Sequence, residues 1–362
     1  MISRTIAAAI CLSCSFCTTV QAESRSWVFV SLLKDRRIVT FERNPDSGEL
    51  TWRGETICPA EPAILSASPD RKTLFASFRS SGQLASFRID PVRGSLAPIS
   101  VVQGGADPAY LLPDRAGRFL ITAYYVANMV TVHSLGQDGS INPTALQKIS
   151  TAEKAHGIAL DSSNRMAFVP HTGANRIFQF QFNPRSGRLI ASNPPFVSTS
   201  VRDHPRHITL HPTDRWAYVG NEAGDSIGVF SVDRDTVSLT RIQTVTTLPD
   251  GFDGSNNATA RCEMTADGRF VYVANRGHDS IAGFAINSST GRVLPLGQTP
   301  TEKTPRSFTI DPRGRHLYVA GEGSGRIAAY RIGTNGALSS MTTYPSGPVS
   351  WSILAVDTPP GP

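Results

Sequence analysis

The chain has 362 residues, of which 40% are hydrophobic and 18% are charged. This balance is typical of a globular protein, and the length allows a large core. The formal net charge is +6, and the basic residues, most of them arginine, are spread along the chain rather than gathered in a run. The sequence therefore predicts no nucleic-acid partner, and small anionic molecules stay open as ligands.

The first residues resemble a secretory signal. An apolar run extends from Ile6 to Phe16, and small residues stand before Ala22 where a signal peptidase cleaves. We expect a signal peptide over residues 1–22 and a mature chain over residues 23–362. The apolar run is shorter than the roughly 20 residues that cross a bilayer, and no later stretch is long and apolar enough. We therefore expect export without membrane insertion.

Seven segments with the same apolar and aromatic pattern recur along the chain, 46 to 54 residues apart. Turn residues such as Pro, Asp and Gly precede each segment from the second onward. A second apolar strand follows, and in most repeats a polar turn and a short outer strand come next. Seven such units of four antiparallel strands predict an all-β, seven-bladed β-propeller as a single domain. The segments align on Phe29, Phe75, Ile121, Phe168, Tyr218, Tyr272 and Tyr318.

The two ends of the chain predict how the ring closes. The first unit begins near Trp27 and lacks the inner strand that every other unit has before its turn. The chain ends in "GPVSWSILAV", an inner-strand pattern without a hairpin to pair with. We expect residues 349–356 to complete the blade that contains Trp27 to Trp52. Closure of this kind leaves only short, protected edges.

The same period accounts for much of the basic charge and for the cysteines. A basic residue stands three positions before the aligned residue in six units, which predicts a role in the turn; these are Lys72, Arg118, Arg165, Arg215, Arg269 and Arg315. Cys11, Cys14 and Cys17 lie in the expected signal. Cys58 follows the outer strand of the first blade and Cys262 lies on the inner strand of the sixth, so we expect both to be unpaired.

Propeller geometry brings two kinds of loop to one face around the central channel, namely the loops into the inner strands and the hairpins between second and third strands. Charged residues gather in these loops, where binding residues are expected. The loops into the inner strands carry His156, His204, Arg206, His207, Arg261 and Arg306, and the hairpins carry His171, Glu222, Arg276 and His278. Opposite charges at a channel mouth favour function for Arg206, Glu222 and Arg276, because such charges are costly to bury without a role.

Two other patterns suggest different chemistry but fit it poorly. A metal site at His204, His207 and His211 is disfavoured because a strand alternates its side chains and no carboxylates gather nearby. The "GDSIG" segment around Ser226 matches a serine-hydrolase pattern, but it lies in a β-hairpin rather than a strand-turn-helix elbow. We expect no metal and no cofactor, and structural roles for His211 and His316.

The segments "HPRHITLHP", "LPDGFDG", "DGRFVYVANRGHDSI" and "TPRSFTIDPRGRHLYVAG" resemble the bacterial seven-bladed propeller lactonases, the 6-phosphogluconolactonase family that is related to carboxymuconate cyclases. The resemblance is dense from about residue 155 onward. It implies lactone chemistry and a catalytic set of a histidine, an arginine, a glutamate and a second arginine. These fall here on His156, Arg206, Glu222 and Arg276. Substrate-binding roles are then expected for His204, His207, Arg261, His278 and Arg306.

Two segments depart from the family pattern. The chain reads "ARCEM" before the sixth-blade turn, which places Arg261 and Glu263 at positions where relatives carry other residues. In the third blade it reads "AYYVANMV", so that Tyr124 and Tyr125 reshape that side of the mouth. We therefore expect the identity of the lactone, rather than the chemistry, to differ between relatives.

Lactone hydrolysis needs a base for water, charged donors for the developing oxyanion and a proton for the leaving ring oxygen. Glu222 or His156 can be the base, and Arg206 and Arg276 can bind and polarise the ester. An exported enzyme meets unphosphorylated sugar lactones, so we expect a periplasmic lactonase for D-glucono-1,5-lactone, with 6-phosphogluconolactone as the substrate of the wider family. The alternatives are a muconate-type cycloisomerase and a non-catalytic propeller that binds a partner.

Overall fold

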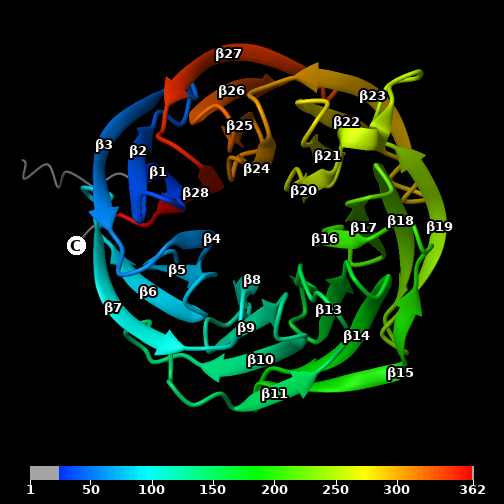
Figure 1. Ribbon diagram of the computed structural model, residues 1–362, viewed down its shortest axis with the longest axis horizontal. Helices are drawn as coiled ribbons and strands as arrows, with labels where there is room; N and C mark the ends of the chain where they lie inside the picture. Colours follow the sequence, from blue (N-terminus) through cyan, green and yellow to red (C-terminus); the bar gives the residue numbers. More distant parts are fainter. Residues whose placement is uncertain (1–23, 361–362) are drawn as a thin grey trace, which may run out of the picture.

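The computed structural model describes residues 24–360 as seven four-stranded antiparallel sheets arranged in a ring around a central axis (Figure 1). The predicted seven-bladed propeller is confirmed. The expected signal peptide lies outside the described residues. In the part of the chain that the structure describes, the single helical element is a short 3-10 turn, η1 (Gly254–Asn256). No helix there is long and apolar enough to cross a membrane.

Each blade runs from an inner strand at the central axis to an outer strand at the rim. Blade 1 comprises β28 (Ser350–Thr358), β1 (Arg25–Leu32), β2 (Arg37–Arg43) and β3 (Leu50–Ile57), and blade 2 comprises β4 (Pro62–Ala67), β5 (Thr73–Phe78), β6 (Gln83–Ile89) and β7 (Leu96–Gln103). Blade 3 comprises β8 (Pro108–Pro113), β9 (Phe119–Tyr124), β10 (Met129–Ser134) and β11 (Gln147–Ser150), and blade 4 comprises β12 (Ala159–Leu160), β13 (Met166–His171), β14 (Arg176–Asn183) and β15 (Arg188–Ser198). Blade 5 comprises β16 (Pro205–Leu210), β17 (Trp216–Asn221), β18 (Ser226–Asp233) and β19 (Ser238–Thr246). Blade 6 comprises β20 (Thr259–Met264), β21 (Phe270–Asn275), β22 (Ser280–Ile286) and β23 (Val293–Pro300), and blade 7 comprises β24 (Pro305–Ile310), β25 (His316–Gly321), β26 (Arg326–Ile332) and β27 (Leu338–Pro345).

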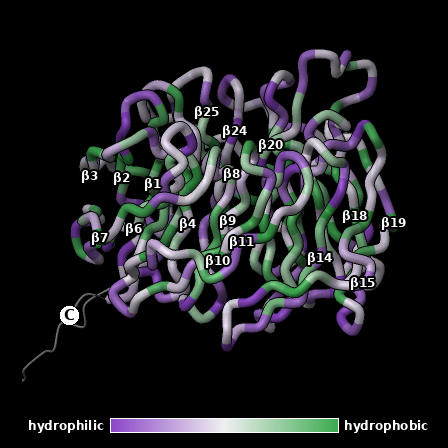
Figure 2. Tube along the Cα trace, turned by 60° about the horizontal axis from the view of Figure 1, so that its bottom comes forward, coloured by the Kyte–Doolittle hydropathy of each residue, from purple (hydrophilic) through white to green (hydrophobic). Residues whose placement is uncertain are grey.

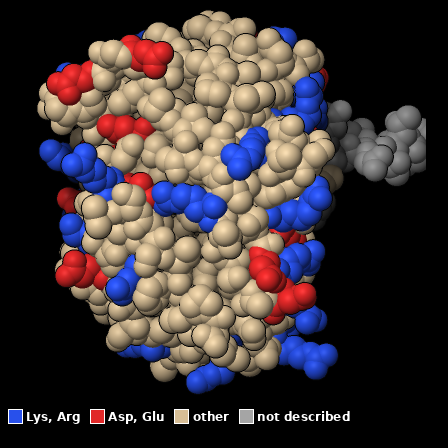
Figure 3. Space-filling model, turned by 90° about the vertical axis from the view of Figure 1, so that its right-hand side faces the viewer, with Lys and Arg blue, Asp and Glu red and all other residues tan. Residues whose placement is uncertain are grey.

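The core lies between neighbouring blades. The second strands of blades 2 to 7 are buried along their whole length, whereas outer strands such as β3 and β27 are mostly exposed. Apolar side chains from adjacent blades pack together, as Tyr272 of blade 6 does with Phe308 and Tyr330 of blade 7. Figure 2 shows hydrophobic residues concentrated in the strands and hydrophilic ones in the loops. Over the side of the molecule in Figure 3, basic and acidic side chains lie in small, interspersed groups.

The last strand closes the ring. β28 pairs antiparallel with β1, from Arg25 opposite Thr358 to Leu32 opposite Ser350. In Figure 1 the red C-terminal strand therefore lies beside the blue N-terminal one. The predicted closure by the C-terminal strand is confirmed, with the strand ending slightly later than expected, at Thr358.

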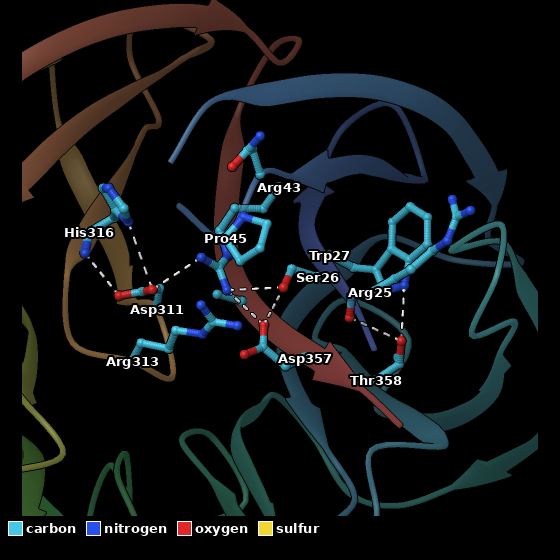
Figure 4. Close-up of polar contacts among 12 residues, drawn as sticks. Arg25, Ser26, Trp27, Arg43, Pro45, Asp311, Arg313, His316, Asp357 and Thr358 are labelled. Atoms are coloured by element: carbon cyan, nitrogen blue, oxygen red, sulfur yellow. Dashed lines mark hydrogen bonds and ion pairs between the residues drawn. The ribbon is translucent and has the colours of Figure 1, made fainter. Parts of the chain in front are cut away.

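A buried arginine joins the two ends of the chain to blade 7 (Figure 4). The Arg43 side chain is fully buried; its Nη1 lies 3.1 Å from Oδ2 of Asp311, and its Nη2 lies 2.7 Å from Oδ1 of Asp357. Nη2 also donates to the hydroxyl of Ser26 over 3.1 Å. Because a buried charge is costly unless it is paired, these contacts specify where the final strand must lie. We call this set of side chains the clasp.

We expect Arg43→Gln to lower the free energy of unfolding by about 3–5 kcal/mol, because it leaves two carboxylates without their buried partner. Urea denaturation measures the change. Arg93→Gln is the control, since Arg93 is 81% exposed and its ion pair with Asp90 spans 3.6 Å; such a pair contributes about 0–1 kcal/mol. Equal effects of the two substitutions would contradict the role of the clasp.

The repeating arginines and tyrosines tie each blade to the next. Guanidinium groups of Arg118, Arg215, Arg269 and Arg315 donate to backbone carbonyls of Pro184, Ser288, Thr334 and Pro45, respectively, in the outer turns of the following blades. The hydroxyl groups of Tyr218, Tyr272 and Tyr318 donate over 2.7–2.8 Å to the carbonyls of Gly291, Gly336 and Gly48 in the same turns. The predicted turn role is therefore confirmed for these four arginines.

Glycine is required in these outer turns by two conditions at once. Gly291 has φ +71°, and a Cβ there would collide with the indole of Trp216 from the preceding blade. Gly297, on β23 of the same blade, also has positive φ, +97°, but no atom lies within 4 Å of where its Cβ would stand. Substitutions at Gly297 and Gly291 therefore distinguish the cost of backbone strain alone from the cost of strain together with a steric collision.

Gly297→Ala should cost only backbone strain, about 1–2 kcal/mol. Gly291→Ala should cost a further 1–3 kcal/mol or so, because Trp216 must move out of a packed interface. Thermal and urea unfolding of both variants test this. If Gly297→Ala proved as destabilising as Gly291→Ala, the packing of Trp216 against this turn would not be the limiting contact.

Both described cysteines are free and buried, as predicted. Burial raises the pKa of the Cys58 thiol and of the Cys262 thiol to about 12. Neither is therefore a reactive thiolate at neutral pH.

Candidate active site

A glutamate between two arginines forms the centre of the candidate site. It lies on the face of the ring that carries the hairpins between second and third strands, which we call the mouth. Arg206 lies on inner strand β16, Glu222 follows β17, and Arg276 follows β21. Oε1 of Glu222 lies 3.3 Å from Nε of Arg206 and accepts a short hydrogen bond from Nη2 of Arg276. The structure thus brings together three residues that the sequence places in separate loops. We call them the Arg–Glu–Arg cluster.

A β-bulge explains how Arg206 leaves its sheet. Pro205 is opposite Asn221 and His207 is opposite Gly220, so Arg206 has no partner in the ladder. Bulges of this kind turn a side chain away from its regular position. The "TPRS" segment of blade 7 has the same bulge, which leaves Arg306 between Pro305 and Ser307. The repeated Pro-Arg therefore delivers an arginine to the mouth from two blades.

Arg206 is almost fully buried, with 2% of its surface exposed. Burial lowers its pKa, and the charges of Arg276 and Arg306 lower it further. The charge of Glu222 acts in the opposite direction. An arginine nevertheless keeps its proton in a protein. Its Nη1 has no hydrogen-bond partner among the described residues. Arg206 is therefore a charged donor with two buried nitrogens, Nε and Nη1, that make no hydrogen bond to a described residue, although Nε is ion-paired with Glu222.

Glu222 is ionised at neutral pH. Burial alone would raise its pKa, but Arg206 and Arg276 outweigh burial and hold the pKa below its ordinary value. The carboxylate is thus committed to the two guanidinium groups. This makes Glu222 a weak base and a strong anchor for both arginines.

Two buried histidines lie beside the cluster. The rings of His156 and His207 are 5.2 Å apart, and each meets a tyrosine edge, Tyr125 at 5.9 Å and Tyr110 at 5.5 Å. Burial, and then the charge of Arg206, lowers the pKa of both imidazoles well below the usual value. Both rings are therefore neutral at pH 7. Nδ1 of His156 has no hydrogen-bond partner within residues 24–360.

A second group of basic side chains extends the mouth. Arg306 pairs with Glu322 over 3.4 Å, and its guanidinium lies 3.6 Å from the ring centre of Trp351. Burial and the charge of Arg276 lower the pKa of Arg306 to about 10. Arg79 pairs with Asp107 and lies over Tyr125 and Trp351, at 5.6 and 5.7 Å from their ring centres.

Arg79 and Trp351 were not predicted. Arg79 lies in the β5–β6 hairpin, the same kind of hairpin that carries Glu222 and Arg276, so hairpin position could have identified it. Trp351 stands one residue into β28, where Arg306 stands in β24, so alignment of the closing strand with the other inner strands could have identified it.

Three predicted binding residues have side chains that contact other groups than the Arg–Glu–Arg cluster. The backbone carbonyl of His204 nevertheless accepts a hydrogen bond from the N–H of Glu222 over 2.9 Å, and the charge of Arg261 helps to lower the pKa of His207. Arg261 pairs with Glu263 over 3.0 Å and lies over the ring of Tyr110. Nδ1 of His278 lies 2.7 Å from the hydroxyl of Ser280, and the ring packs edge-on against Phe252. His204 takes positive φ and binds Asn175 through its backbone N–H.

The two disfavoured sites have ordinary structural contacts. His211 packs against Trp216 and lies 2.8 Å from the hydroxyl of Thr213. The hydroxyl of Ser226 accepts a hydrogen bond from Asn221 in the β17–β18 hairpin, as its place in the repeat predicts. His316 contacts Asp311 of the clasp. In the described part of the chain, no three His, Cys, Asp or Glu residues are grouped to hold a metal ion.

Residues 27–354 match the family described as "Lactonase, 7-bladed beta-propeller", and the chain belongs to this family. A 6-phosphogluconolactonase of Enterobacter sp. (strain 638) is 32% identical over 322 residues, which cover 88% of this chain and 96% of that protein. The 6-phosphogluconolactonase of Pectobacterium carotovorum subsp. carotovorum (strain PC1) is 30% identical, covering 86% and 93%. The structure of the periplasmic gluconolactonase PpgL of Pseudomonas aeruginosa matches with a TM-score of 0.84 at 24% identity, covering 93% of this chain and all of that one. The family resemblance seen in the sequence is confirmed.

The electrostatics of Glu222 give a test that needs no substrate. Arg276→Gln removes one of the three arginine charges that lower the pKa of Glu222, together with its hydrogen bond, so the pKa should rise. Titration of the carboxyl carbon by NMR in the labelled protein measures it. Arg326→Gln removes an exposed arginine that pairs with Glu302, and should leave the titration of Glu222 unchanged. A pKa that stays constant or falls in Arg276→Gln would contradict the assignment.

Proposed function

We propose that this protein is a hydrolase that opens a sugar lactone at the mouth. The observation that carries the proposal is the buried Arg–Glu–Arg cluster beside two neutral histidines. It supplies charged donors and a free imidazole nitrogen within one site, as ester hydrolysis requires. Membership of the lactonase family supports the same reaction.

In the proposed reaction, Arg206 and Arg276 bind the carbonyl oxygen of the lactone. The buried Nη1 of Arg206 can donate to that oxygen, and its charge stabilises the oxyanion that forms when water attacks. Glu222 holds both guanidinium groups in place by accepting from Arg276 and pairing with Arg206. Preorganised donors of this kind need no rearrangement during the reaction.

His156 is the better placed base of the two residues considered. The pKa of each group is lowered, but Nδ1 of His156 has no hydrogen-bond partner among the described residues, whereas the Glu222 carboxylate is held by two charged partners. The water oxygen bonds to the carbonyl carbon and its proton moves to Nδ1 of His156. The bond between the carbonyl carbon and the ring oxygen then breaks, and the imidazolium returns the proton to that oxygen. The product is a hydroxy acid whose carboxylate the arginines can hold.

We propose D-glucono-1,5-lactone in the periplasm as the favoured substrate. The arginines of the mouth, Arg79, Arg206, Arg276 and Arg306, face three carboxylates, so one guanidinium charge stays uncompensated within this group. One surplus charge suits a neutral lactone and its singly charged product better than a phosphate ester. The expected signal peptide agrees with this choice, and PpgL is named a periplasmic gluconolactonase. The relatives named 6-phosphogluconolactonase make the phosphorylated lactone the alternative.

A pH-indicator assay of the mature protein against D-glucono-1,5-lactone, its 6-phosphate and unrelated lactones tests the proposal. Proton release should be fastest with the unphosphorylated sugar lactone. Arg206→Gln and Glu222→Gln should each lower kcat/KM by about a hundredfold or more. Ser226→Ala and His211→Asn should stay near the wild-type rate. An inactive Ser226→Ala beside an active Glu222→Gln would overturn the site, and no proton release with any lactone would favour a binding module.

A further inference from the structure

The junction between blades 4 and 5 is built differently from the others. The turn before the outer strand holds a glycine with positive φ in six blades, and these glycines are Gly48, Gly94, Gly139, Gly187, Gly291 and Gly336. Blade 5 has Val237 there, with φ +53°. Positive φ is rare and strained for a β-branched residue. Blade 4 opposes this turn with Met166, where the neighbouring blades 3 and 5 oppose theirs with Phe119 and Trp216.

The repeating arginine also lacks its usual partner at this junction. In blades 3, 5, 6 and 7 this arginine donates to a carbonyl of the next blade's turn. In blade 4 it is Arg165, and the corresponding carbonyl belongs to Arg234, whose own positive charge disfavours the approach of a second guanidinium. Within residues 24–360, the side chains of Arg165, Arg185 and Arg234 have no ion pair.

A cavity of about 630 Å³ lies at this junction, on the face opposite the mouth. Its apolar lining includes Met166, Phe182 and Val237, and the unpaired Arg165, Arg185 and Arg234 line it together with Asp235. The volume is within the range of small-molecule sites. Three guanidinium groups against one carboxylate leave two positive charges, which a dianion would neutralise.

The junction between blades 2 and 3 shows the effect of having no aromatic residue opposite the turn, without the additional arginines. Between blades 2 and 3, Thr73 faces Gly139 and a cavity of about 350 Å³ opens. Its one arginine, Arg118, is already bonded to the carbonyl of Pro184. A small residue therefore opens space, whereas the junction of blades 4 and 5 adds three guanidinium groups without an ion pair to a larger cavity.

We propose that the cavity between blades 4 and 5 binds a small molecule with two or more anionic groups. The arginines would hold the anionic groups, since guanidinium binds carboxylate and phosphate through paired hydrogen bonds. A short carbon skeleton would contact Ile190, which lines the cavity and is 57% exposed. The ligand is a di- or tricarboxylate or a phosphate compound, and it binds independently of the lactone at the mouth.

Isothermal titration calorimetry with inorganic phosphate, succinate and citrate tests the site. The double variant Arg165→Gln, Arg234→Gln should raise the Kd of the anion that binds about tenfold or more, because two of three charges are lost. Arg269→Gln is the matched control: it removes the repeat arginine of blade 6 and should leave Kd unchanged. If phosphate alone binds, the arginines are the binding groups and the apolar lining makes no contribution. If citrate binds more tightly than phosphate, the apolar lining contributes to binding as well.

The arginines of the mouth could also bind anions, so a second variant separates the two faces. Arg206→Gln combined with Arg276→Gln should keep the anion binding, whereas the cavity double variant should lose it and keep lactone hydrolysis. The proposal is overturned if none of the three anions binds, if the cavity double variant binds as tightly as Arg269→Gln, or if only the mouth variant loses binding. Failure of lactone hydrolysis in the wild type would count against the proposed function alone.

Discussion

The pairing of β28 with β1 is the contact on which the rest of the ring depends. A propeller whose first blade lacked its inner strand would expose the edge of β1 and the apolar faces of blades 1, 2 and 7. The clasp adds charge to this hydrogen-bonded closure, because Arg43 reaches both Asp311 of blade 7 and Asp357 of the last strand. Main-chain pairing with β1 thus sets the register of β28. The buried ion pairs of Arg43 favour β28 as the strand that completes blade 1.

The periodic pattern was sufficient to predict the fold, because every blade repeats the same apolar strand, turn and outer strand. It also predicted where the mouth would lie, and so found Arg206, Glu222 and Arg276. The periodic pattern could not predict which contacts each side chain makes at the mouth. Arg206 enters the mouth through a bulge that skips one residue of the ladder, and the alternation of apolar residues does not indicate this bulge, although blade 7 repeats it at its own Pro-Arg. Trp351 meets Arg306 because β28 lies beside β24 in the closed ring, and the pairing pattern of the closing strand does not by itself indicate this side-chain contact.

The candidate site holds charged and neutral groups side by side in a buried environment. Burial keeps His156 and His207 neutral, whereas Arg206 and Glu222 stay charged because they form an ion pair. Each group at the mouth therefore depends on a neighbour from another blade: Glu222 of blade 5 accepts from Arg276 of blade 6, and Arg306 of blade 7 covers Trp351 of blade 1. The mouth is a property of the closed ring rather than of any single blade.

Trp351 lies on the strand that is made last. The ribosome completes all seven outer strands before residues 350–358 exist, yet those residues supply both the closing edge of blade 1 and the ring that Arg306 covers. A chain that is still being synthesised therefore lacks one wall of its mouth. Assembly of the site is coupled to synthesis of this strand, so that a fragment ending before residue 350 lacks the ring against which Arg306 packs.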